Sequence, residues 1–194
     1  MQSLAQSRYG NHAATTVSDW RAMVERIAAL DDSSRLEQVN TFFNQRIDWR
    51  EDMETWEKYD YWATPLETMA RGSGDCEDFS IAKYMTLLLA GTDVDKLRIT
   101  YVKAHIGGNA LDRQYEAHMV LAYYAKPNAE PLILDNLVDS IQPASKRPDL
   151  KPVFGFNSKG LWVGGAVASA TQDPGARLSR WREILQRMSA DGLG

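Results

Sequence analysis

The stretch that decides the fold is TPLETMARGSGDCEDFSIAKYMTLLLAG, residues 64–91. Its first part combines a helix-capping threonine, Thr64, with Pro65 at the first helical position and Glu67 three residues after the cap. Threonine and glutamate at this spacing form a capping box, and proline suits a position where the helix makes no use of an N–H. A short helix is therefore expected to begin at Pro65 and to end near Gly72.

The second part of the stretch predicts a longer helix over residues 76–90, which Asp75 can cap and Gly91 can end. Its side chains are apolar nearly all round, which is typical of a helix without a solvent-facing side. We therefore expect it to be the buried central helix of the fold. Its apolar members are Ile81, Ala82, Tyr84, Met85, Leu87, Leu88 and Leu89.

The flanking sequence predicts further helices before this stretch and a sheet after it. Ser18 can cap an amphipathic helix, and Ser34 and Glu37 have capping-box spacing before another one. Beyond the central helix the apolar period changes to two, and Asp173-Pro174 opens a last amphipathic helix. Helices followed by antiparallel strands indicate an α+β fold. Strands are expected over residues 97–104, 118–124 and 132–138 and near 161–163, with a proline-rich loop over 143–152.

The composition is that of an ordinary globular protein, with 194 residues of which 44% are hydrophobic and 25% are charged. This length fits one domain, and we expect a flexible N-terminal arm over residues 1–17 followed by a single domain over 18–194. A net charge of −4 argues against a nucleic-acid-binding protein, which would concentrate Lys and Arg. No apolar run reaches the roughly 18–20 residues of a membrane span, and residues 1–16 lack the apolar core of a signal peptide.

Cys76 is the only cysteine, which excludes an intramolecular disulfide and a cysteine-based zinc site. It is expected in the first turn of the central helix, where the helix dipole and the free N–H groups stabilise a thiolate or an oxyanion. Gly72 and Gly74 before it would let a substrate backbone approach closely. From the residues alone, Cys76 is either a nucleophile or a buried, unreactive side chain that acts as a small hydrophobe.

A thiolate nucleophile needs a base. His118 is the one histidine within an apolar strand pattern, and Asp135 likewise interrupts the next apolar run along the chain. A hairpin turn centred at 126/127 places the two directly opposite, and one centred at 127/128 places them diagonally, on one face roughly 5–8 Å apart. An odd-length loop would separate them onto opposite faces. If paired, Asp135 would fix the imidazole tautomer and leave the other ring nitrogen for the nucleophile. Otherwise, His118 is a core histidine and Asp135 only ends its strand.

Three acids surround the cysteine, namely Asp75, Glu77 and Asp78. Acids at a helix N-terminus are ordinarily explained by capping and the helix dipole, at roughly 0.3–1 kcal/mol each. Three negative charges, however, raise the pKa of a neighbouring thiol and oppose the thiolate. A bound hard cation would remove this conflict, and oxygen ligands of this kind suit Ca²⁺. Helix capping and a calcium site therefore both stay open.

Three blocks carry the candidate residues in the order cysteine, histidine, aspartate. The blocks are YWATPLETMARGSGDCEDFSIAKY (61–84), AHMVLAYY (117–124) and LILDNLVDSIQPASKRPDL (132–150). With these blocks the chain resembles the bacterial transglutaminase-like cysteine proteinases over about residues 18–163. The resemblance implies a papain-like, transglutaminase-like α+β fold in which the cysteine helix packs on an antiparallel sheet.

The resemblance also implies the role of each candidate residue. Cys76 would be the nucleophile, His118 the general base and acid, and Asp135 the residue that orients the histidine. Members of the family depend on calcium, which would be bound here by Asp75 and Glu77. Asp78 also matches the family motif. It would either bind the calcium ion or only cap the helix.

The substrate, partner and location implied by the resemblance are those of periplasmic adhesin-cleaving proteases. Such enzymes cut the N-terminal region of a large cell-surface adhesin within a dialanine motif. The periplasmic domain of an inner-membrane cyclic-di-GMP receptor sequesters them, so low cyclic-di-GMP frees the enzyme and the biofilm disperses. Relatives carry a secretion signal, so we interpret Met1 as the start of a trimmed, mature chain. The alternatives are acyl transfer to an amine, as in true transglutaminases, and a non-catalytic calcium-stabilised binding module.

Overall fold

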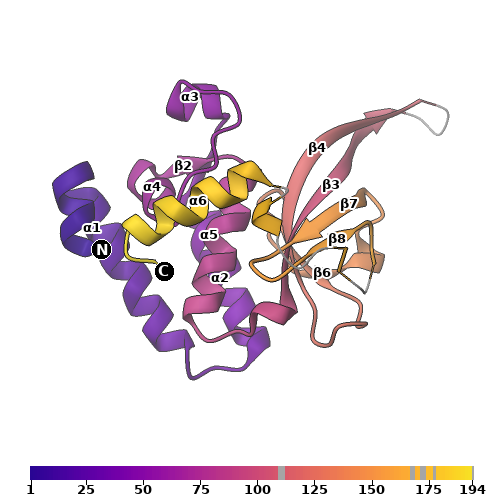
Figure 1. Ribbon diagram of the computed structural model, residues 1–194, viewed down its shortest axis with the longest axis horizontal. Helices are drawn as coiled ribbons and strands as arrows, with labels where there is room; N and C mark the ends of the chain where they lie inside the picture. The colour runs from indigo at the N-terminus through magenta and orange to yellow at the C-terminus, as the bar shows by residue number, and fades with distance from the viewer. Residues whose placement is uncertain (109–111, 167–168, 171–173, 177, 194) are drawn as a thin grey trace.

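The computed structural model describes residues 1–108, 112–166, 169–170, 174–176 and 178–193. A layer of helices packs on one face of a six-stranded sheet (Figure 1). The strand order is β6-β5-β4-β3-β7-β8, and each neighbouring pair in this sheet is antiparallel. This arrangement confirms the expected α+β fold class.

The elements follow the expected order of helices first and strands later. The helices are α1 (Gln2–Ile27), α2 (Asp32–Arg46), α3 (Asp52–Trp56), α4 (Pro65–Arg71), α5 (Cys76–Leu89) and α6 (Ser179–Ala190). The sheet strands are β3 (Leu97–Gly108), β4 (Arg113–Tyr123), β5 (Leu132–Leu134), β6 (Gln142–Pro143), β7 (Leu150–Phe156) and β8 (Leu161–Val163). Two short parallel strands, β1 (Asp48–Trp49) and β2 (Ser73–Gly74), pair with each other beside α5.

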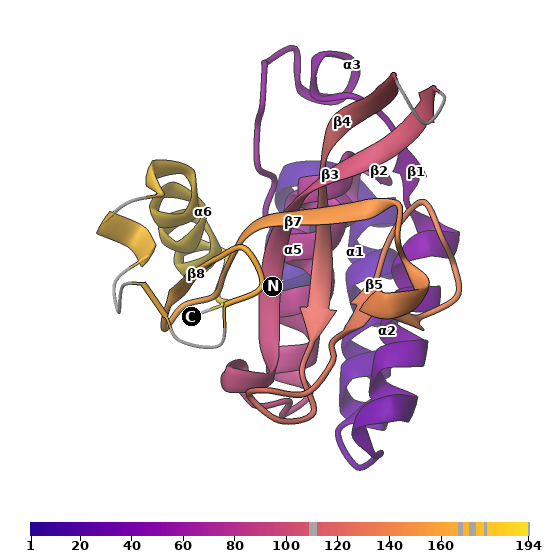
Figure 2. The same ribbon diagram turned by 90° about the vertical axis from the view of Figure 1, so that its right-hand side faces the viewer.

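The capping signals around α4 and α5 act as the sequence predicted. Thr64 and Glu67 form the capping box of α4, and Gly72 ends that helix in the left-handed conformation, with φ at 67°. The Asp75 side chain accepts from the N–H groups of Glu77 and Asp78, so α5 begins at Cys76. The helix α5 lies at the centre of the helical layer and packs on β4 and β3 (Figure 2).

Residues 2–17 differ from the expected flexible arm, because they form the first part of α1. The helix bends at Gly10, whose φ of 85° is not helical, and Ala13 and Val17 on the following turns are buried. Small apolar residues at these positions let the helix pack closely on the core, although the segment has too little periodic hydrophobicity for a helix to be predicted there.

The cap of α2 is Asp31 and not the expected Ser34. The Asp31 carboxylate accepts a hydrogen bond from the N–H of Ser34.

The two faces of the sheet have different neighbours. Along β3, Leu97 and Ile99 belong to the main core with α5, whereas Arg98, Thr100 and Val102 line a separate cavity on the far face. The alternation expected for this strand is thus present.

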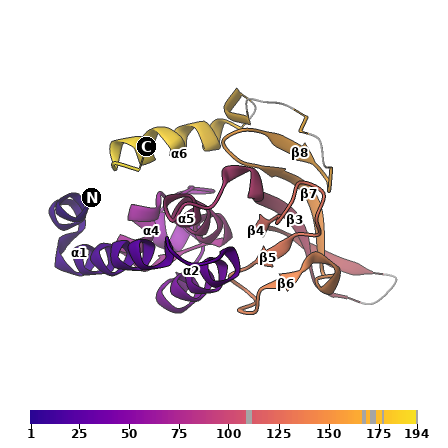
Figure 3. The same ribbon diagram turned by 90° about the horizontal axis from the view of Figure 1, so that it is seen from below.

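The helix α6 lies alongside the helical layer, with one end near β8 (Figure 3), and its Trp181 ring contacts Tyr84 and Phe156. Asp173, which was expected to help open this helix, lies outside the described residues.

The strand β7 was not predicted, because Pro152 and Gly155 make its sequence look like part of a loop. Its pairing with β3 is irregular at this point: Tyr101 pairs with Phe154 and Val102 with Pro152, so one β7 residue is bulged out. A bulge is where a strand tolerates proline.

Among the described residues, no helix is long and apolar enough to cross a membrane.

Candidate active site

The thiol of Cys76 is held at the N-terminus of α5, between the helix and the sheet. Its Sγ donates a hydrogen bond of 2.8 Å to Oε2 of Glu77, the next residue in the helix. Burial raises the pKa of the Cys76 thiol, and the negative charges of Glu77 and Asp75 raise it further. This arrangement therefore favours the thiol over the thiolate, and the acid that receives the hydrogen bond is one that the family resemblance assigned to calcium.

His118 and Asp135 form a pair, which is one of the two alternatives that the sequence left open. Residues Leu121 and Leu134 face each other across β4 and β5, which corresponds to the turn centred at 127/128 and places His118 and Asp135 diagonally. The Nε2 atom of His118 lies 2.8 Å from Oδ1 of Asp135, and both side chains are buried. Burial alone would raise the pKa of Asp135, but the hydrogen bond and charge of His118, with other partners, lower it to about 2.

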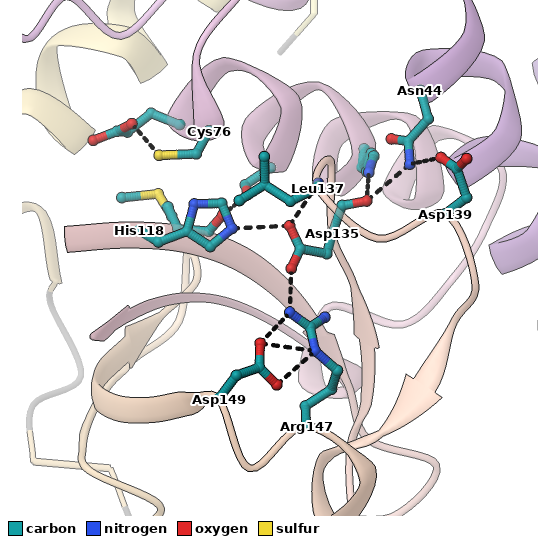
Figure 4. A network of polar contacts seen from close by, with 12 residues as sticks. Asn44, Cys76, His118, Asp135, Leu137, Asp139, Arg147 and Asp149 are labelled. Carbon is teal, nitrogen blue, oxygen red and sulfur yellow. Dashed lines mark hydrogen bonds and ion pairs between the residues drawn. The ribbon is translucent and has the colours of Figure 1, made fainter. Parts of the chain in front are cut away.

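Asp135 is held from several directions by residues distant in the sequence (Figure 4). Its Oδ2 receives a hydrogen bond of 2.8 Å from Nη2 of Arg147, which also pairs with Asp149. Its main-chain carbonyl accepts from Asn44 Nδ2 at 2.9 Å and from the buried Lys83 Nζ at 3.1 Å. The carboxylate is therefore fixed in ionised form next to the histidine.

The thiol and the histidine line one pocket of about 580 Å³. With Nε2 of His118 bound to Asp135, the Nδ1 atom lies on the side of the ring toward Cys76 (Figure 4). In the structure the Sγ hydrogen bond goes to Glu77 and not to this nitrogen. The pocket has an apolar part of its rim that is exposed, beside exposed acids of the same lining. Its members are Trp49, Met53, Tyr59, Ile106 and Leu137, from 41% to 84% accessible.

A cluster of three carboxylates lies beside the cysteine. Oxygen atoms of Asp52, Asp75 and Asp78 all lie within 4.8 Å of one another. Burial, with the neighbouring negative charges, raises the pKa of Asp75 to about 9 and that of Asp78 well above its ordinary value. Burial likewise raises the pKa of Asp52 to about 6. Of the two residues expected to bind calcium, the structure thus places Asp75 in the cluster, whereas Glu77 contacts the thiol.

The donor set of this cluster fits a hard cation. Oδ1 of Asp52 and Oδ2 of Asp78 are buried without a hydrogen-bond partner among the described residues. Buried carboxylates with raised pKa values tend to hold protons, and a cation that replaces these protons gives the free oxygens a partner. Ca²⁺ prefers carboxylate oxygens as ligands.

Asp52 was not predicted as a ligand, and its only signal is its place in an acid-rich segment. Arg147 and Lys83 carried no signal at all.

A helix-borne cysteine that shares a pocket with a buried histidine–aspartate pair defines the class of thiol-dependent acyl-transfer sites. The sequence family described as bacterial transglutaminase-like cysteine proteinase matches residues 8–149 of the chain. The chain therefore belongs to this family of cysteine proteinases.

Three solved structures of Legionella pneumophila LapG resemble the chain over nearly its whole length. One is described simply as LapG, one as calcium-bound and one as EGTA-treated, and their sequence identities are 40%, 40% and 41%. The TM-scores are 0.80, 0.81 and 0.81, and the matches cover 96% of this chain and 94%, 96% and 95% of those chains. A comparison with curated proteins gives no match.

Proposed function

We propose that this protein is a calcium-dependent cysteine endopeptidase with Cys76 as nucleophile, His118 as general base and acid, and Asp135 as the orienting residue. One observation carries the proposal, namely that Cys76 shares a pocket with a buried histidine whose far nitrogen is bound by an ionised aspartate. This is the division of roles that thiol proteases need.

The reaction follows from these positions. The Cys76 thiol gives its proton to His118 Nδ1 while Sγ forms a bond with the peptide carbonyl carbon. The main-chain N–H groups at the start of α5 face the developing oxyanion. When the C–N bond breaks, His118 returns the proton to the leaving amine and a thioester remains. Water, which loses a proton to His118, then attacks the thioester, and the acid product and the thiol are released.

Glu77 determines whether the thiol is ready to react. In the structure it accepts the thiol hydrogen bond and raises the thiol pKa. Calcium bound among Asp52, Asp75 and Asp78 would supply positive charge that neutralises the carboxylates beside the thiol. Glu77, which the family resemblance also assigns to calcium, would be a further carboxylate for the ion, and its charge would then oppose the Cys76 thiolate less.

For the substrate, we propose the N-terminal region of a large surface adhesin, cut between two alanines, with release of the adhesin and dispersal of the biofilm. The family resemblance supports this assignment. The exposed apolar rim, including Trp49 and Leu137, supports a polypeptide substrate, because exposed apolar patches mark binding surfaces. By the same resemblance we propose a periplasmic location and sequestration by the periplasmic domain of a cyclic-di-GMP receptor.

The test is cleavage of an adhesin N-terminal fragment that carries an Ala-Ala site. We expect cleavage by the wild type in excess Ca²⁺, and a loss of at least about a thousandfold with chelator or with Cys76→Ala. Cleavage by Cys76→Ala would disprove the nucleophile, and cleavage that ignores chelator would disprove the calcium dependence. If folded protein with calcium does not cut the fragment, incorporation of an amine into a glutamine peptide would assign the site to acyl transfer.

A further inference from the structure

A second cavity lies on the face of the sheet opposite α5, bounded by β3, β4 and β7. Its volume is about 260 Å³. The proposed proteolysis makes no use of it. A cavity of about 150 Å³ can hold benzene, so this one has room for a ring or branched chain with a polar head. Its apolar wall consists of Val102, Val120, Ala122, Ile133, Leu150 and Trp162.

Arg98 brings a buried positive charge to this cavity. Its side chain is only 4% exposed, and its guanidinium lies between the rings of Tyr124 and Trp162, with Cζ 4.2 Å from each ring centroid. Nη1 donates to the carbonyl of Ala166 at 3.1 Å, but buried Nε has no acceptor. In the described part of the chain, no carboxylate pairs with Arg98. A buried cation without a counter-ion is costly, so an anion entering the cavity would be stabilised.

Arg147 places a second buried guanidinium in the wall of the same cavity. It is 7% exposed, and its Nε and Nη2 atoms bind Asp149 and Asp135. The third nitrogen, Nη1, is buried and has no acceptor among the described residues; no dashed line reaches it in Figure 4. Two arginines thus line a mostly apolar cavity, and each has a buried nitrogen without an acceptor among the described residues.

We propose that this cavity binds a small carboxylate with an apolar body, held by Arg98 and Arg147. The planar guanidinium matches the geometry of a carboxylate, and the wall of aliphatic side chains and Trp162 favours an apolar body over a second charge. The carboxylate belongs either to a free organic acid or to the C-terminus of a peptide that ends in an apolar residue. Both sources have the same chemistry at the arginines.

Arg147 connects this cavity to the candidate active site. The same guanidinium that faces the carboxylate site holds Oδ2 of Asp135, which in turn binds His118. Occupancy of the cavity is therefore expected to change the turnover rate, and this part rests on the proposed function. Binding itself does not, so a binding measurement tests the cavity even if the chain proves not to be a protease.

Calorimetric titration of the full chain with phenylacetate and with its neutral isostere phenylacetamide tests the site. We expect the acid to bind at least about tenfold more tightly than the amide, since the amide leaves the guanidinium charge unpaired. Arg98→Met should weaken phenylacetate binding about tenfold, whereas Lys159→Met, which removes a cation from an exposed position, should leave it unchanged. N-acetylleucine and its amide form a second pair, and tighter binding of N-acetylleucine than of phenylacetate would identify a peptide end as the source.

Ala122→Leu supplies an independent variant in case Arg98→Met does not fold. Ala122 lines the cavity and is 2% exposed, so leucine there fills the space and leaves both arginines in place. Phenylacetate binding should be lost from protein whose near-UV circular dichroism is unchanged. The proposal is overturned if acid and amide bind equally, if neither acid binds at about 10 mM, or if binding survives both variants.

Discussion

At the scale of single residues, Glu77 is the side chain that contacts the Cys76 thiol and, after burial, contributes most to its raised pKa. A carboxylate that accepts the thiol hydrogen bond stabilises the thiol over the thiolate, both by this bond and by its charge. His118 and Asp135 are already paired, so the histidine needs no rearrangement to act as a base. Under the proposed mechanism, we therefore expect activation of the site to involve a change at Glu77 and not at the histidine.

Replacement of this carboxylate tests its influence directly. In chelator, Glu77→Gln should speed alkylation of Cys76 by iodoacetamide roughly tenfold at neutral pH, because removal of the negative charge lowers the thiol pKa and each pKa unit changes the thiolate fraction tenfold. Glu116→Gln, an exposed acid lining the same pocket, is the control and should leave the rate unchanged. Equal rates in Glu77→Gln and wild type would show that Glu77 does not restrain the thiol.

At the scale of elements, the tight passage from α4 to α5 holds the acid cluster together. The αL turn at Gly72 and the β1–β2 pairing bring Gly74 directly against Asp78. A Cβ atom on Gly74 would lie 2.7 Å from Oδ2 and 2.8 Å from Cβ of Asp78, closer than real Cβ contacts come. Glycine is required here because there is no space for a side chain, and φ at Gly74 is not positive.

Gly74→Ala should therefore displace Asp78 from the cluster. We expect the metal-free protein to lose about 1–3 kcal/mol of stability, as overpacked sites do, and the rise in Tm on addition of Ca²⁺ to disappear. Gly107→Ala is the matched control, because a Cβ atom there has no neighbour within 4 Å. Thermal melts with chelator and with Ca²⁺ measure both effects, and an undiminished calcium shift in Gly74→Ala would contradict a metal site at Asp78.

At the scale of the whole molecule, we expect the acid cluster to couple stability to pH and, if it binds the proposed ion, to calcium. The folded-state pKa values of Asp52 and Asp75, about 6 and about 9, lie above the unfolded value of about 3.9. The folded chain then binds more protons than the unfolded chain, so stability falls as pH rises through this window. Asp135, with its pKa of about 2, contributes stability above pH 4 that is constant over the same window.

In chelator, Tm should therefore decrease between pH 5 and pH 8, by at least about 5 °C. Excess Ca²⁺ should remove this decrease, because the ion takes the place of the protons. Asp52→Asn should flatten the curve in chelator, whereas Asp19→Asn, at an exposed position on α1, should not change it. A Tm that rises with pH in chelator would contradict the charge arrangement of the cluster.

Local signals predicted the parts of the molecule that depend on nearby residues. The capping residues Thr64 and Asp75 predicted where α4 and α5 begin, since a cap acts on N–H groups two or three positions away. The helical first part of α1 was missed because its buried face consists of small residues such as Ala13. The strand β7 was missed because Pro152 is accommodated by a bulge that only its partner strand defines.

The sequence by itself determined that Cys76 begins a buried helix, because a helix start follows from local capping. For His118 and Asp135 the sequence left more than one register open, and the pairing of β4 with β5 decided that the two side chains meet. Only the tertiary structure decided that Asp52 joins the acid cluster and that Arg147 holds Asp135. These contacts depend on where separate elements pack, and packing is set by the summed burial of the whole core. No short pattern in the chain carries that information.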